Sequence, residues 1–156
     1  MISATHLHAM IVHFPIALLL VGFLFETIGL FSKKTFFQQA GFYLLILAAA
    51  GAITAYLTGN AAGEGMEGGS MGKAIEAHEQ AATITLWLTV ATALLRSAYE
   101  ILKNKMLWLK IISFVLFTSA VAGVSYTGYL GGQLVFKHAA GVELSIGGSD
   151  SNQSED

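Results

Sequence analysis

The chain has 156 residues, of which 54% are hydrophobic and only 12% charged, and its mean hydropathy is +0.64. Soluble domains carry roughly 25% charged residues, so this composition indicates a protein that resides in lipid. The absence of cysteine excludes disulfides, thiolate metal sites, iron–sulfur clusters and covalently attached c-type haem. The net charge is -2, and the eight basic residues form no cluster interleaved with aromatic residues, so no nucleic-acid binding is expected.

Four apolar segments are long enough to cross a bilayer, which takes about 20 residues. They run from Ala9 to Phe31, Phe36 to Thr58, Ala81 to Leu102 and Leu107 to Leu130. Lipid offers the backbone no hydrogen-bond partners, so each segment is predicted to be an α-helix. Arg96 and Glu100 interrupt the third segment and are expected to reach the membrane interface. Glu26 in the first segment is expected to have an interfacial role, and the alternative is a functional intramembrane acid, for instance in proton transfer. The expected fold is an all-α, polytopic four-transmembrane-helix bundle.

The basic residues predict the orientation, because Lys and Arg accumulate on the cytoplasmic side of membrane proteins. Six of them fall around the two short connections, namely Lys33, Lys34, Arg96, Lys103, Lys105 and Lys110. Only Lys73 and Lys137 fall on the other side. Both termini and the connection from Asn60 to Ala77 are therefore predicted to lie outside the cytoplasm. The first ten residues contain no Lys or Arg, so the first segment is predicted to be a permanent span, not a secretory signal.

The segments outside the predicted helices differ in composition. The Gly-rich stretch from Gly59 to Ala74 is predicted to be a mobile external connection, since glycine loses much backbone entropy in a regular element. Gln133 to Ile146 mixes apolar and polar residues and is expected along the outer membrane–water interface. Residues 147–156 are polar and acidic and are predicted to be a disordered tail. Residues 1–146 then form the four-helix transmembrane domain.

A short pattern, T-[AG]-Y-L-[TG]-G, occurs at the ends of the second and fourth segments, at Thr54 to Gly59 and at Thr127 to Gly132. Each copy follows a helix that has a histidine near its outer start, His13 in the first helix and His78 in the third. This self-similarity predicts two parallel helical-hairpin repeats related by an axis along the membrane normal. His13 and His78 are then expected to face each other. Small and aromatic residues also recur at interfacial helix ends, which is the alternative explanation.

All five histidines are predicted to lie in the outer half of the molecule, although they come from separate segments. They are His6, His8, His13, His78 and His138. His13 precedes Pro15, a residue well suited to the first turn of a helix. His8 lies five residues before His13, about 140° around an ideal helix. A ligand shared by these two histidines would require the backbone to depart from a regular helix.

Facing imidazoles in a helix bundle ligate haem b or copper. We therefore predict His13 and His78 as the cofactor or metal ligands, with His138 or His8 as a supporting or further ligand. Two carboxylates, Glu76 and Glu79, flank His78, where they would orient its second ring nitrogen or favour the helix N-terminus. Copper is the alternative to haem because methionine binds Cu(I) as well as filling apolar space. The outer methionines are Met10, Met66 and Met71.

Two motifs carry a resemblance to a known family. They are V-H-F-P-I-A from Val12 to Ala17 and G-G-x-L-V-[FY]-x-H from Gly131 to His138. Together with His78, they make the chain similar to a widespread family of predicted bacterial inner-membrane proteins, domain of unknown function 2231 (DUF2231), up to about Leu144. The resemblance implies four helices and an inner-membrane location, and it suggests an association with periplasmic electron-transfer or cytochrome systems. Members often have proline where this chain has Ala9.

Three hypotheses for the function follow. The first is a membrane-embedded electron-transfer subunit that binds haem b or another metal and works with periplasmic cytochromes or other membrane redox subunits. The second is a scaffold or accessory subunit that holds no cofactor. The third is a small transporter or metal-handling protein, which the scarcity of buried charges disfavours. Homo-oligomerisation is compatible with all three. The sequence shows no carboxylate–histidine–serine grouping of a hydrolase, so the chain is not expected to be an enzyme on its own.

Overall fold

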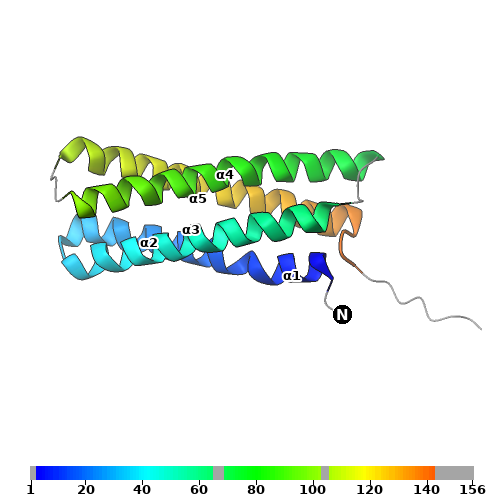
Figure 1. The fold of residues 1–156 in the computed structure, drawn as a ribbon, viewed down its shortest axis with the longest axis horizontal. Coiled ribbons are helices and arrows are strands. Elements are labelled where there is room, and N and C mark those ends of the chain that lie inside the picture. Colours follow the sequence, from blue (N-terminus) through cyan, green and yellow to red (C-terminus); the bar gives the residue numbers. More distant parts are fainter. Residues whose placement is uncertain (1–2, 65–68, 103–105, 143–156) are drawn as a thin grey trace, which may run out of the picture.

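The computed structural model describes residues 3–64, 69–102 and 106–142. The helices are α1 (Ala4–Ile11), α2 (His13–Ser32), α3 (Thr35–Gly63), α4 (Gly69–Ile101) and α5 (Leu107–His138). Together α1 and α2 make one bent helix, and Figure 1 shows an elongated bundle of four long rods. Within the described ranges, four helices are long and apolar enough to cross a membrane. The predicted all-α bundle with four spanning helices is confirmed.

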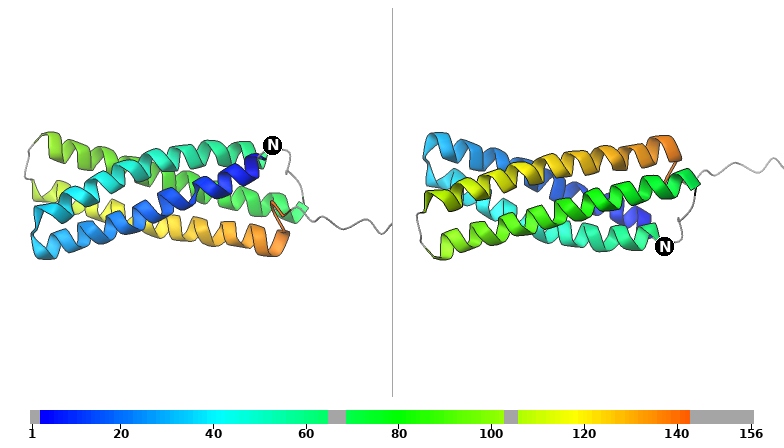
Figure 2. Two further views of the ribbon diagram at one scale, coloured as in Figure 1. Left: turned by 90° about the horizontal axis from the view of Figure 1, so that it is seen from below. Right: turned by 90° about the horizontal axis from the view of Figure 1, so that it is seen from above.

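The four rods form two antiparallel hairpins, α2 with α3 and α4 with α5, which lie side by side in Figures 1 and 2. The end of α2, the start of α3, the end of α4 and the start of α5 lie at one end of the bundle, which we call the hairpin end. The start of α1, the end of α3, the start of α4 and the end of α5 lie at the opposite end, which we call the terminal end. Helix α3 packs against α4, and α2 packs against α5, so the hairpins close a four-helix arrangement.

The helices extend further at the terminal end than the sequence predicted. Helix α3 continues to Gly63 and α4 begins at Gly69, so most of the stretch predicted to be a mobile connection is helical. Helix α5 likewise continues to His138, through the first part of the segment expected along the interface. Each glycine costs roughly 1 kcal/mol in a helix, and packing between the rods offsets this cost. Met66 and the tail predicted to be disordered lie outside the described residues.

The bend between α1 and α2 lies at Val12, three residues before the only proline. Pro15 has no N–H, so it cannot donate to the carbonyl four residues earlier. The backbone N–H of Ile16 donates to Val12 at 3.3 Å, and Nδ1 of His13 donates to the carbonyl of Ala9 at 2.7 Å. The helical segment begins at Ala4, five residues before the predicted start at Ala9, and it continues as one rod past the bend.

Small side chains dominate the interior of the bundle. Its buried hydrophobic core comprises Leu19, Leu45, Ala48, Ala49, Ala93, Phe117, Ala120 and Val124. Alanine lets helix backbones approach closely, which is how helices associate where lipid removes the hydrophobic driving force. Large apolar side chains are exposed instead, among them Phe14, Leu47, Trp87 and Val115. A surface so rich in apolar groups fits a lipid environment and not an aqueous one.

The two hairpins bury equivalent positions. On α2 and α4, buried residues form pairs that are 70 positions apart in the chain. These pairs are Pro15 and Thr85, Leu19 and Thr89, Gly22 and Thr92, and Glu26 and Arg96. On α3 and α5, buried residues form pairs that are 72 positions apart. These pairs are Gly41 and Ser113, Leu45 and Phe117, and Ala48 and Ala120. The predicted pair of parallel hairpin repeats is confirmed.

The register of the repeat differs by one residue from the sequence pattern. That pattern aligns Thr54 with Thr127, an offset of 73 positions. The buried residues of α3 and α5 align at an offset of 72 positions instead. One residue turns a helix by about 100°, so only the 72-residue register makes α3 and α5 present equivalent faces to the interior. A short sequence motif does not determine the rotation of α3 and α5 about their own axes, whereas the packing of the helices does.

Candidate functional site

The side chains of two histidines from different repeats lie next to each other near the terminal end. His8 lies on α1 and His78 on α4, and both side chains are partly buried. Their ring centres are 6.5 Å apart, with the ring planes at 86°. The two residues are 70 positions apart, the same spacing as the buried pairs of α2 and α4. The histidine pair is therefore a pair of equivalent residues that meet where the repeats meet.

Each ring of the histidine pair is held by an equivalent hydrogen bond. Nδ1 of His8 donates to the backbone carbonyl of Ala55 at 3.0 Å, and Nδ1 of His78 donates to that of Thr127 at 3.1 Å. Ala55 and Thr127 are 72 positions apart, so the acceptors are equivalent too. A carbonyl can only accept, which assigns the proton to Nδ1 and leaves a lone pair on Nε2. This is the arrangement by which proteins orient metal-binding histidines.

A glycine behind each ring makes room for it. A Cβ atom on Gly59 would lie 2.9 Å from Cε1 of His8, and one on Gly131 would lie 3.2 Å from Cε1 of His78. These glycines are also 72 positions apart. Each imidazole thus lies directly against the backbone of α3 or α5, where any larger residue would displace it. Gly59 ends the first copy of the sequence pattern, whereas its equivalent is Gly131 and not the Gly132 that the pattern selected.

His13 does not lie where the sequence predicted it. His8, rather than His13, stands against His78, so the predicted facing pair is corrected. The reason is that α1 prolongs the first rod beyond the bend and brings His8 to the level of His78. The residue equivalent to His13, 70 positions further on, is Thr83. The His13 side chain is exposed, and its Nδ1 donates to Ala9 within the same rod.

The remaining histidines lie at the same end of the bundle. His6 is exposed on α1, and His138 is the partly buried last residue of α5. Within the described ranges, no three side chains among His, Asp and Glu come together as a metal site. The histidine pair of His8 and His78 is thus a two-ligand arrangement.

The second feature on the repeat interface is a buried ion pair near the hairpin end. Nη2 of Arg96 on α4 lies 3.4 Å from Oε2 of Glu26 on α2, and the two side chains are only 6% and 7% exposed. Arg96 also donates to Glu100 and lies 5.2 Å from the ring centre of Tyr99 and 6.0 Å from that of Phe42. The Glu26 and Arg96 side chains therefore point into the bundle, rather than outward as snorkelling to the interface requires. Two carboxylates and two aromatic faces compensate the guanidinium for leaving water.

These two features occupy opposite ends of the same interface. Glu26 follows His8 by 18 residues, and Arg96 follows His78 by the same 18 residues. At 1.5 Å per residue this is roughly 27 Å along the bundle. The ion pair was not predicted, because the positions of Glu26 and Arg96 in the sequence do not by themselves show that the two residues meet. The signal was present as opposite charges at equivalent positions of a repeat.

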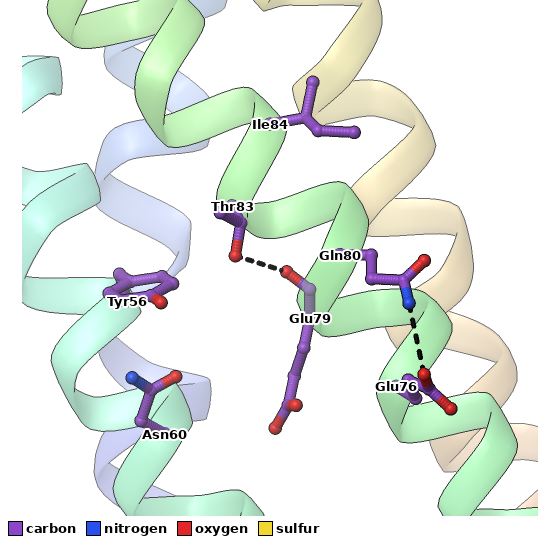
Figure 3. Close-up of a pocket in the computed structure, with 7 residues that line it drawn as sticks. All are labelled: Tyr56, Asn60, Glu76, Glu79, Gln80, Thr83 and Ile84. Carbon is purple, nitrogen blue, oxygen red and sulfur yellow. Dashed lines mark hydrogen bonds between the residues drawn. The ribbon is translucent and has the colours of Figure 1, made fainter.

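A groove opens between α3 and α4 near the terminal end (Figure 3). It is lined by Tyr56, Asn60, Glu76, Glu79, Gln80, Thr83 and Ile84. Glu79 directly follows His78, and Tyr56 directly follows Ala55, the residue whose carbonyl holds His8. The Glu79 carboxylate reaches α3, since a Cβ atom on Gly63 would lie 2.6 Å from its Oε1.

The fold and the repeat interface define an integral membrane protein of four spanning helices, built from a duplicated hairpin that sets one histidine of each copy against the other. The chain belongs to the family described as predicted membrane protein DUF2231, whose model matches residues 4–144. The family resemblance found in the sequence is confirmed. No curated protein and no solved structure matches the chain.

Proposed function

We propose that this chain is an electron-transfer subunit of the bacterial inner membrane that binds haem b, which His8 and His78 would hold. The observation that carries the proposal is the histidine pair itself, whose ring centres are 6.5 Å apart. Two imidazoles that coordinate one metal ion from opposite sides, at about 2 Å per nitrogen, have ring centres roughly 6 Å apart. The pair therefore has the spacing of two ligands on a single ion.

The number of ligands favours haem over a bare metal ion. Zinc and copper sites in proteins use three or four protein donors, and the described residues supply only two imidazoles here. Haem iron needs only axial ligands from the protein, because the porphyrin supplies the other donors. When bound, haem would supply a one-electron carrier. The carbonyls of Ala55 and Thr127 would orient the imidazoles and raise their basicity, which stabilises the oxidised iron.

The basic residues support a periplasmic position for the histidine pair. Lys33, Lys34 and Lys110 lie near the hairpin end, and positive charge favours the cytoplasmic side. The terminal end, with the histidine pair, would then face the periplasm and exchange electrons with a periplasmic cytochrome or another membrane redox subunit. Single cysteines at Ser3 and Ser32 test this orientation, since the natural chain has none. A membrane-impermeant thiol reagent should label S3C but not S32C in intact spheroplasts, and the reverse pattern would refute the orientation.

The absorption spectrum of the detergent-purified protein, before and after dithionite, tests haem binding. We expect the oxidised and reduced spectra of a haem with two imidazole ligands. His8→Ala and His78→Ala should each abolish them, whereas His13→Ala and His138→Ala should retain them. A folded but colourless wild-type protein would favour the scaffold hypothesis. Haem that survives both His8→Ala and His78→Ala would show that the ligands lie elsewhere.

A further inference from the structure

We infer that the groove between α3 and α4 binds the head group of a membrane-soluble hydroquinone, which donates electrons to the histidine-pair site. This inference rests on the proposed function for its redox step, whereas the binding step is independent of it. In this groove, polar groups from both hairpins converge (Figure 3), at the end of the bundle that also holds the histidine pair.

The surroundings of the groove require an occupant with an apolar body. Large apolar side chains of α3 and α4 next to it are exposed, with Leu57, Ile84 and Trp87 at 62%, 61% and 65%. On a membrane-spanning bundle such side chains face lipid, so a ligand can enter sideways from the bilayer. The polar lining lies nearer the terminal end, at Asn60 and Glu79, and the apolar lining lies deeper, at Ile84. A molecule with a polar head at the interface and a tail in lipid matches this gradient.

The polar groups of the groove match a hydroquinone. Within the described ranges, the side chains of Tyr56, Asn60 and Glu79 make no hydrogen bond to another protein group. Figure 3 shows Glu79 projecting into the space between α3 and α4. A hydroquinone carries two hydroxyl donors on an aromatic ring, and a carboxylate and an amide oxygen are suitable acceptors. No basic residue lines the groove, and Glu76 and Glu79 would repel an anionic lipid head group.

The position of Glu79 suits the proton chemistry of hydroquinone oxidation. Oxidation of one hydroquinone to its quinone releases two electrons and two protons, and a haem held by His8 and His78 would, when bound, accept the electrons one at a time. Glu79, the neighbour of His78 in the chain, would take the first proton from the bound hydroxyl. The second proton would pass to water at the terminal end. Glu79 and the histidine pair would thus lie at the same end of the bundle.

Anaerobic stopped-flow reduction by a decyl-substituted hydroquinone tests the inference. A positioned proton acceptor typically contributes at least 10²-fold to a rate, so Glu79→Gln should slow haem reduction by the hydroquinone about 100-fold. Its spectrum and its reduction by dithionite should not change. Glu64→Gln is the matched control, because Glu64 is an exposed carboxylate at the same end that does not line the groove.

A binding measurement separates the two proposals. In a Trp108→Phe background, which leaves Trp87 as the single tryptophan, quenching of fluorescence by the corresponding decyl-quinone should saturate, and Asn60→Leu should weaken it. If the protein lacks haem but shows this saturable quenching, the proposed function fails and the quinone site stands. If haem is present and dithionite reduces it, but the hydroquinone reduces wild type and Glu79→Gln equally and quenching does not saturate, the quinone site is refuted while haem binding stands.

Discussion

Breaking the buried ion pair between the hairpins should be strongly destabilising, and Arg96→Met tests this. The substitution leaves Glu26, whose side chain is 7% exposed, without a cation in the bundle interior. Removing one partner of a buried pair costs about 3–5 kcal/mol, because the remaining charge is uncompensated. We expect the free energy of unfolding to fall by that amount. Unfolding of the detergent-solubilised protein by SDS, followed by far-UV circular dichroism, measures it.

Two further variants separate the loss of the pair from the loss of side-chain volume. In Glu26→Met with Arg96→Met, no buried charge remains, and replacing a buried pair by apolar residues is often neutral or stabilising. This double variant should recover most of the lost stability. Glu100→Gln removes only the partly exposed partner of Arg96, 42% exposed, and should cost about 0.5 kcal/mol. The reasoning is refuted if Arg96→Met costs less than about 1 kcal/mol or if the double variant is no more stable than Arg96→Met.

Two more predictions concern the support of the histidine pair. Gly131→Leu should abolish the haem spectrum, because its Cβ would lie 3.2 Å from Cε1 of His78, whereas Gly128→Leu should preserve it, since nothing lies within 4 Å of a Cβ there. Equal spectra of the two variants would contradict the packing of the ring against α5. Thr85→Val removes the 3.1 Å hydrogen bond between the hydroxyls of Thr85 and Thr127, and should lower the melting temperature in detergent by an amount that corresponds to about 1 kcal/mol. Because the Thr127 carbonyl is unaffected, its spectrum should remain that of the wild type.

The position of the ion pair also favours the pairing of the first hairpin with the second over the pairing of two identical hairpins. Glu26 and Arg96 are equivalent residues that meet on the interface of the repeats. Two copies of the first hairpin packed in this way would set Glu26 against Glu26, and two copies of the second would set Arg96 against Arg96. Like charges at such short range are strongly unfavourable in a low-dielectric interior. Opposite charges therefore favour the pairing of the first hairpin with the second.

The sequence by itself determined the four membrane-spanning helices and their arrangement as two parallel hairpins. Runs of apolar residues as long as those of Phe36 to Thr58 and Leu107 to Leu130 have only one stable backbone in lipid, because every N–H and C=O must bond within its own segment. The repeat was visible at the ends of the second and fourth helices, and the motif at Val12 to Ala17 indicated the family. All of these signals are local or periodic.

Only the tertiary structure decided which residues meet on the repeat interface. His8 rather than His13 stands against His78 because the first rod continues past the bend at Val12, and because packing fixes the rotation of each helix. The proximity of Glu26 and Arg96, 70 positions apart, likewise arises from packing between hairpins. A shift of one residue turns a side chain by about 100° around its helix. Hydropathy fixes how deep a residue lies in the membrane, whereas contact between close-packed helix faces fixes which way it points.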